Sequence, residues 1–265
     1  MRRTVTFIAV LVATVLAASF LPPDTSLQQV KKSGVLRVCM PRSYPPFVTD
    51  QGERPGLDVE IMRAVAQELD LRLFIAVNPA MGTTFDPRRW NVNRAQCQVL
   101  AGGTVGTTTT RSYLEVSAPY MVTGWAMVSE SDLDMRSGTR VAVYSTNAGL
   151  DRLALSQVLR DRQVSIVVAQ TIDQAEDMLA SGAVDALILD AVLASQTSAT
   201  HGWHFSWVAE DLSAFPVVLG FWKGDITLKR AIENALVQLG SSGRLDEIRE
   251  AYGLSALWQE WRATR

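Results

Sequence analysis

Histidine and cysteine are scarce in this chain, which contains two of each among 265 residues. His201 and His204 fall in a polar segment with no cluster of ligands nearby, so we expect surface residues rather than a metal site. A net charge of −2, with 20% charged residues, provides neither the basic patch that nucleic-acid binding needs nor an acidic tail. No apolar run after residue 20 approaches the length of a membrane span. We therefore expect no metal or other cofactor and no nucleic-acid partner.

The N-terminal segment has the layout of a secretory signal peptide. Arg2 and Arg3 precede an uncharged, mainly apolar run, Val5–Ala18, which ends in small residues. At roughly 15 residues the run is short for a membrane span, which needs about 20. We expect residues 1–19 to be removed on export to the periplasm; a retained anchor is the alternative. No cysteine follows the run, so a lipid anchor on an N-terminal cysteine is not expected. Roughly 245 residues remain, enough for one large domain or two modest ones.

Cys39 and Cys97 are expected to form a disulfide once the chain leaves the reducing cytoplasm. Each lies at one end of a short β-like run, Val35–Cys39 and Cys97–Ala101. Adjacent strands can bring two such sulfur atoms within bonding range. Closing a loop of this length contributes about 4 kcal/mol in the chain-entropy model. Two free, buried thiols are the alternative.

Strand-like and helix-like segments alternate along the rest of the chain. Continuous apolar strands between helices are typical of parallel sheets covered on both faces. The pattern predicts two α/β units of similar plan, without a visible sequence repeat, and ligands of such sheets lie beyond the carboxyl ends of the strands. The expected strands are residues 35–39, 73–77, 97–101, 139–144, 164–169, 184–189 and 217–222, and the expected helices are residues 57–71, 150–160, 171–182, 227–239 and 245–252.

Several short segments near these strand ends follow one another in a characteristic order and spacing. They are Gly34–Val38 followed by Tyr44–Phe47, Gly56–Glu60, Ser117–Tyr120, Val184–Ala186 leading to Asp190, and Gly243 leading to Tyr252 and Gly253. Each segment is weak evidence alone. Together they resemble the extracytoplasmic solute-binding proteins of family 3, the type that serves polar amino-acid ABC importers.

The resemblance implies an α/β protein with the type II periplasmic-binding-protein fold. In that fold two doubly wound sheets form two lobes, a two-strand hinge joins them, and the ligand lies in the cleft. The first lobe would comprise residues 30–121 and 213–265, and the second residues 124–209. The hinges would fall near Met121–Gly124 and Leu212–Pro216, and closure of such lobes around a ligand is a known motion.

The resemblance also assigns ligand contacts in the first lobe. Tyr44 and Phe85 would sandwich the ligand's side chain, because an aromatic face attracts a cation. Packing in the core is the alternative for both residues. Gly102 and Gly103, followed by Thr104, would let the ligand approach the main chain closely. An ordinary turn after the strand is the alternative there.

In the second lobe, Asp190 matches the family carboxylate that holds the ligand's α-ammonium group. A buried carboxylate at a strand end needs a partner, and a bound cation supplies one. Capping of the following helix is the alternative. Ser145, Thr146 and Asn147 occupy the loop where the family places a Gly-Ser/Thr-Thr sequence, one residue shorter here. They would bind an anion at the start of the next helix, or only cap that helix.

One family position does not fit. The family has an arginine three residues after a threonine, where its guanidinium binds the ligand's α-carboxylate. Alignment without gaps puts Thr110 at that position, and Arg111 follows one residue late. A slip by one residue within Thr107–Thr110 would place Arg111 three residues after Thr108 and restore the site.

The resemblance implies a monomeric binding protein, not an enzyme, that captures an amino acid or similar zwitterion and delivers it to an ABC permease in the inner membrane. A second reading rests on Cys39, Cys97 and the segment Arg94–Cys97. They resemble a branch of this fold whose members serve periplasmic quinoprotein alcohol dehydrogenases. A third reading is an enzyme, since some periplasmic dehydratases and peptidoglycan lyases use the same scaffold.

Overall fold

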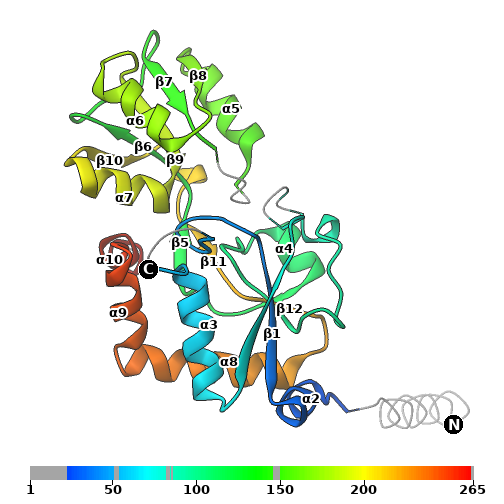
Figure 1. The fold of residues 1–265 in the computed structure, drawn as a ribbon. Coiled ribbons are helices and arrows are strands. Elements are labelled where there is room, and N and C mark those ends of the chain that lie inside the picture. Colours follow the sequence, from blue (N-terminus) through cyan, green and yellow to red (C-terminus); the bar gives the residue numbers. More distant parts are fainter. Residues whose placement is uncertain (1–22, 51–53, 82–83, 85, 146–149, 264–265) are drawn as a thin grey trace, which may run out of the picture.

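The chain folds into two α/β lobes in a computed structural model that describes residues 23–263 apart from 51–53, 82–83, 85 and 146–149 (Figure 1). The expected signal peptide lies outside the described residues. The first lobe contains a five-stranded sheet in which β1 pairs in parallel with β2 and β3, while β12 runs antiparallel between β3 and β4. Its order is β2 (Arg72–Val77), β1 (Val35–Met40), β3 (Val99–Leu100), β12 (Gly220–Phe221) and β4 (Glu115–Val116).

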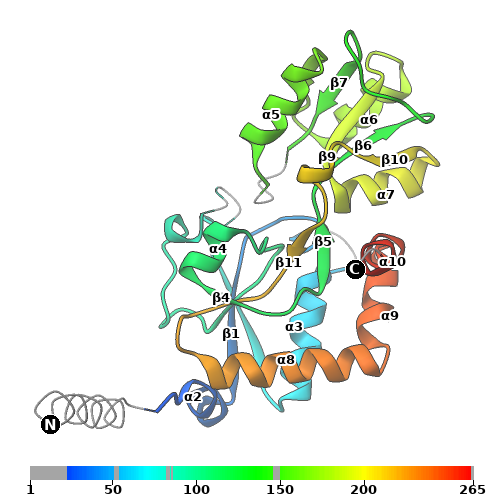
Figure 2. The same cartoon turned by 180° about the vertical axis from the view of Figure 1, so that it is seen from behind.

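Helices from both ends of the chain cover this first sheet (Figures 1 and 2). Helix α3 buries an apolar stripe, as its sequence pattern predicts, and packs on β2 and α8. It ends at Glu68, before the expected end at Leu71, because the chain turns at Asp70 with a positive φ of 55°. The helices of this lobe are α2 (Ser26–Ser33), α3 (Leu57–Glu68), α4 (Thr108–Tyr113), α8 (Ile226–Ser241), α9 (Arg244–Ala251) and α10 (Ser255–Ala263), with a 3₁₀ turn, η1, at Pro87–Arg89.

The second lobe contains another five-stranded sheet. Strand β7 pairs in parallel with β8 and β9, and β6 runs antiparallel to β9 and β10. Its order is β10 (His204–Trp207), β6 (Trp125–Ser129), β9 (Ala186–Asp190), β7 (Arg140–Val143) and β8 (Ser165–Val168), with the helices α5 (Arg152–Asp161), α6 (Ile172–Ala180) and α7 (Ala191–His201) and the 3₁₀ turn η2 (Glu210–Leu212).

A capping box starts α6, as its sequence predicts. The Thr171 hydroxyl accepts a hydrogen bond from the Gln174 amide at 3.1 Å. The Gln174 side chain reaches back to the Gln170 amide at 2.8 Å.

Two antiparallel strands, β5 (Met121–Thr123) and β11 (Phe215–Val217), connect the lobes. The single strand expected at residues 217–222 is therefore wrong. Val217 ends the hinge strand, and Gly220 starts β12 in the first sheet. An apolar run shows that a segment is buried, but it does not show that the segment changes partners within a few residues.

The predicted disulfide is present and joins β1 to the chain just before β3. The Cys39 and Cys97 sulfur atoms are 2.00 Å apart, with the Cα atoms at 5.6 Å. Both residues are buried, and Trp222 Nε1 donates to the Cys97 carbonyl at 2.7 Å. The bond therefore lies inside the first lobe and braces two neighbouring strands of its sheet.

The C-terminal helices lie beside the hinge (Figure 2). Helix α10 packs against β5, and its Trp258 and Trp261 are buried and stacked with ring centroids 4.9 Å apart. Arg249 of α9 lies over Trp258 at 4.4 Å and donates two hydrogen bonds to the carbonyl of Tyr120, directly before β5. Gln196 of α7, in the second lobe, donates to the carbonyl of Tyr252 at 2.9 Å. The C-terminal segment thus contacts both the hinge and the second lobe.

Candidate ligand-binding site

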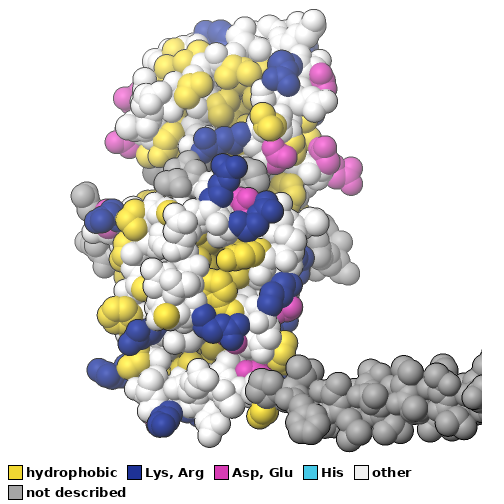
Figure 3. Space-filling view, turned by 90° about the vertical axis from the view of Figure 1, so that its right-hand side faces the viewer, with side chains coloured by type: hydrophobic (Ala, Val, Ile, Leu, Met, Phe, Trp, Pro, Cys, Tyr) yellow, Lys and Arg dark blue, Asp and Glu magenta, His cyan; other side chains and the backbone are white. Residues whose placement is uncertain are grey.

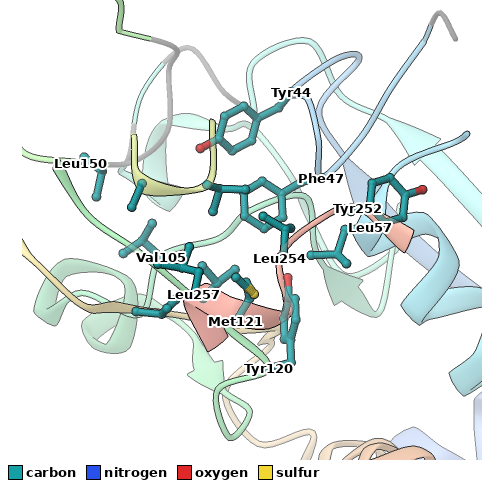
Figure 4. Close-up of a cluster of buried hydrophobic side chains, with 14 of the residues drawn as sticks. Tyr44, Phe47, Leu57, Val105, Tyr120, Met121, Leu150, Tyr252, Leu254 and Leu257 are labelled. Atoms are coloured by element: carbon teal, nitrogen blue, oxygen red, sulfur yellow. The ribbon is translucent and has the colours of Figure 1, made fainter. Parts of the chain in front are cut away.

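A cavity of about 190 Å³ lies where the two lobes meet, beside the hinge. The first lobe contributes Val105 and Thr107–Thr109, the hinge strand contributes Phe215, and the second lobe contributes Leu150 and Asp151. Figure 4 shows Val105 and Leu150 in one cluster of buried side chains with Tyr44 and Phe47. Because its walls come from both lobes, any change in the angle between the lobes changes the shape of this cavity.

Tyr44 packs on the turn after β3, near this cavity. It is buried, and its ring lies 5.2 Å from that of Phe47. Gly103 has a φ of +72°, and a Cβ atom there would lie 2.3 Å from Tyr44 Cε1. The position therefore requires glycine for two reasons, backbone conformation and space. Phe85, the second expected aromatic residue, lies outside the described residues.

A carboxylate that the sequence reading missed, Asp58 of α3, holds this turn from behind. Its Oδ2 atom accepts hydrogen bonds from the amides of Gly102 at 2.5 Å and Gly103 at 2.9 Å, and from the Tyr120 hydroxyl at 2.6 Å. Oδ1 has no hydrogen-bond partner among the described residues. Burial raises the pKa of Asp58 to about 6, against the lowering effect of the three donors. Both glycine amides are thus engaged inside the protein.

The register of α4 is set by its N-terminal cap. Thr107 accepts a hydrogen bond from the Thr110 amide, so Thr110 lies three residues after the cap. The Thr110 side chain is buried and donates to the Val105 carbonyl at 2.7 Å. Arg111 follows one residue later, and its Nε donates to the Gly106 carbonyl at 3.1 Å. Arg111 therefore lies four residues after the capping threonine. Thr104, also expected at the site, is buried, and its carbonyl accepts from the Val218 amide.

Helix α5 starts at Arg152 rather than at Leu150, and its own chain caps it. Asp151 Oδ1 accepts from the amides of Leu153 at 2.9 Å and Ala154 at 3.0 Å. An aspartate directly before a helical pattern is a cap signal that the sequence reading overlooked. Of the three loop residues expected to bind an anion there, Thr146 and Asn147 lie outside the described residues.

Ser145 lines a second cavity, of about 390 Å³, within the second lobe. This cavity lies between α5 and the strands β7 and β8, and Trp125, Tyr144 and Arg152 also line it. Contact between Ser145 and a ligand stays a prediction.

Asp190 ends β9 and caps α7. Its side chain is 2% exposed, and Oδ1 accepts from the Leu193 amide at 3.1 Å. The pKa of Tyr144 is raised, first by burial and then by the negative charges of Asp190 and Asp173. Tyr144 therefore lies within electrostatic range of the Asp190 carboxylate. The capping role of Asp190 is thus visible, and its contact with a ligand stays a prediction.

Two further findings concern only the described residues. They contain no group of three or more His, Cys, Asp or Glu side chains placed to hold a metal ion. None of the helices that they form has both the length and the apolar character that crossing a membrane requires.

Comparison with known proteins gives consistent matches over most of the chain. The family model of the bacterial extracellular solute-binding proteins, family 3, matches residues 36–255. A probable amino-acid-binding protein of Bacillus subtilis (strain 168), YxeM, is 24% identical over 221 residues, which are 80% of either chain.

Solved structures show the same fold. The ancestral cationic amino acid solute-binding protein AncCDT-1 has a TM-score of 0.70 at 21% identity, over 86% of this chain and 99% of that one. A polar amino acid ABC uptake transporter substrate-binding protein from Streptococcus thermophilus has a TM-score of 0.67 at 19% identity, over 87% and 89%. A mutant of ArgBP from T. maritima has a TM-score of 0.60 at 25% identity, over 86% and 98%. The predicted two-lobed type II fold is confirmed.

Proposed function

The chain belongs to the bacterial extracellular solute-binding proteins of family 3, as its sequence motifs predict, and from this we propose that it captures a small polar ligand of the amino-acid type between its lobes. We further propose that it acts in the periplasm as a monomer and delivers the ligand to an ABC permease in the inner membrane. The observation that carries this proposal is the interlobe cavity, whose walls come from both lobes and from the hinge strand.

Capture would use the hinge. Rotation about β5 and β11 would move Leu150 and Asp151 toward Thr107–Thr109 and enclose the ligand. Tyr44 would cover an apolar or cationic part of the ligand, and Asp190 would hold its ammonium group. Gly102, Gly103 and Thr104 would form the floor of the site, with Asp58 fixing the turn.

The test is thermal unfolding of protein recovered from the periplasmic fraction of an expressing host, against a panel of amino acids and related amines. Ligand at about 100 times its dissociation constant adds roughly 2.7 kcal/mol to the free energy of unfolding. That gain raises Tm by a few degrees. The matched control is Asp190→Asn, which keeps an oxygen able to cap α7 but removes the charge. We expect it to melt like the parent protein without ligand and to lose most of the ligand-induced shift. No shift with any compound would contradict the proposal.

The disulfide favours one second candidate, a partner of a periplasmic quinoprotein dehydrogenase. The sequence resemblance to that branch rests on Cys39 and Cys97, and the structure pairs them. Such a partner would co-purify with a dehydrogenase and would change its turnover when added back. Recovery of the protein with permease subunits alone would count against this candidate.

We also propose that the protein binds its ligand without chemical conversion. The names of its relatives describe binding proteins, although one structural neighbour is described as a precursor of cyclohexadienyl dehydratase. Incubation of each bound compound with the protein, followed by mass spectrometry, tests this point. Appearance of a new product would identify an enzyme.

A further inference from the structure

If the proposed capture function holds, the contacts around the interlobe cavity restrict its ligand further. We infer that the preferred ligand is a cationic amine without an α-carboxylate, rather than the amino acid that carries the same side chain. The inference rests on the internal hydrogen bonds that the described residues make at three expected anion-binding elements, and on the charges that remain.

The turn after β3 is the first element. An α-carboxylate would need the amide hydrogens of Gly102 or Gly103, but both donate to Asp58. An anionic ligand would have to displace a buried carboxylate that already holds three donors. The turn therefore leaves neither of these two amides to a ligand carboxylate.

The start of α4 is the second element. The position where the family resemblance calls for a guanidinium holds Thr110, which is buried and hydrogen-bonded to Val105. The neighbouring Arg111 donates from Nε to the Gly106 carbonyl, and it is not among the residues that line the cavity. A bidentate arginine–carboxylate pair, the strongest contact expected for an amino acid, is therefore not formed from this position.

The start of α5 is the third element. The amides at the start of a helix and the helix dipole attract an anion, but the carboxylate of Asp151 already accepts from two of these amides. Asp151 also lines the cavity, so it adds negative charge where a ligand carboxylate would lie. The nearest cation along the chain, Arg152, lines the other cavity, beneath α5.

The remaining charges favour a cation. Among the described residues, the cavity lining contains one charged side chain, Asp151, and no lysine or arginine. Lys and Arg side chains do occur around the junction of the lobes, on the outer surface seen in Figure 3. Val105, Leu150 and Phe215 supply apolar walls suited to the methylene chain of an amine. Asp190 and the Tyr44 face, if they contact the ligand as proposed, would add to the attraction for a cation.

Matched pairs of ligands test the inference. We would titrate L-arginine against agmatine and L-lysine against cadaverine by isothermal calorimetry, since the members of each pair differ only by the α-carboxylate. We expect each amine to bind at least tenfold more tightly than its amino acid. Equal or tighter binding of the amino acids would overturn the inference and leave the proposed function intact. If no amine binds, the inference fails; if the full amino-acid panel also gives no shift, the proposed function fails with it.

Variants of α4 test the reason for the preference. Thr109→Arg places a cation on the cavity wall without disturbing the Thr107–Thr110 cap. We expect it to raise the affinity for L-lysine relative to cadaverine by about tenfold, the effect of one charge-assisted hydrogen bond. Ser112→Arg, exposed on the same helix, is the control and should leave the ratio unchanged. Arg111→Ala should also leave it unchanged; a large loss of L-lysine binding there would overturn the inference.

Discussion

Asp58 should make the protein more stable as the solution becomes mildly acidic. Burial raises the pKa of Asp58 from 3.8 to about 6, so the folded protein binds a proton at pH values where the unfolded chain does not. The free energy of unfolding contributed by this group therefore rises as the pH falls from about 7 to about 4. A shift of roughly two pKa units, at about 1.4 kcal/mol per unit, makes the full effect about 3 kcal/mol.

The assay is urea denaturation of the parent protein and Asp58→Asn at several pH values between 4 and 7.5. Asparagine has nearly the same shape and does not titrate. Other carboxylates contribute equally to both proteins, so the difference between the two curves isolates Asp58. Between pH 7 and pH 4, we expect the stability of the parent to rise by about 2 kcal/mol relative to that of Asp58→Asn. A difference that stays constant, or that changes in the opposite direction, would refute the account of this buried carboxylate.

Three further predictions concern stability. Reducing the Cys39–Cys97 bond, which spans 58 residues, should lower the free energy of unfolding by about 4 kcal/mol, measured by urea denaturation with and without reductant. Gly103→Ala should cost about 1–3 kcal/mol more than Gly138→Ala, because both have positive φ but only the first meets Tyr44; equal losses would show that the ring simply moves. Asp151→Ala should cost about 1 kcal/mol by removing the α5 cap, whereas Asp151→Asn should retain most of that stability in thermal melts.

Local patterns predicted the elements of this fold well where periodicity and caps are decisive. The strand expected at residues 35–39 is β1, and the capping box at Thr171 starts α6. The strand expected at residues 217–222 failed because pairing partners are a tertiary property. Pro216 and Val217 pair with β5, whereas Gly220 pairs with two strands of the first sheet.

The candidate site was less predictable because it, too, depends on contacts between segments that are far apart in the sequence. The sequence marked Gly102 and Gly103, but it could not show that Asp58 already binds their amides from 44 and 45 residues away. Four consecutive threonines also offer no local preference for which of them caps α4. A single hydrogen bond from the Thr110 amide shows that the cap is Thr107.

The tryptophan pair on α10 gives the hinge an intrinsic optical signal. Trp258 and Trp261 stack beside β5, and the guanidinium of Arg249 lies on one face of the pair. Indole emission depends on stacking and on nearby charge, so a twist of the hinge strand that shifts α10 also changes the emission spectrum. Movement of the lobes can therefore be followed in the unlabelled protein.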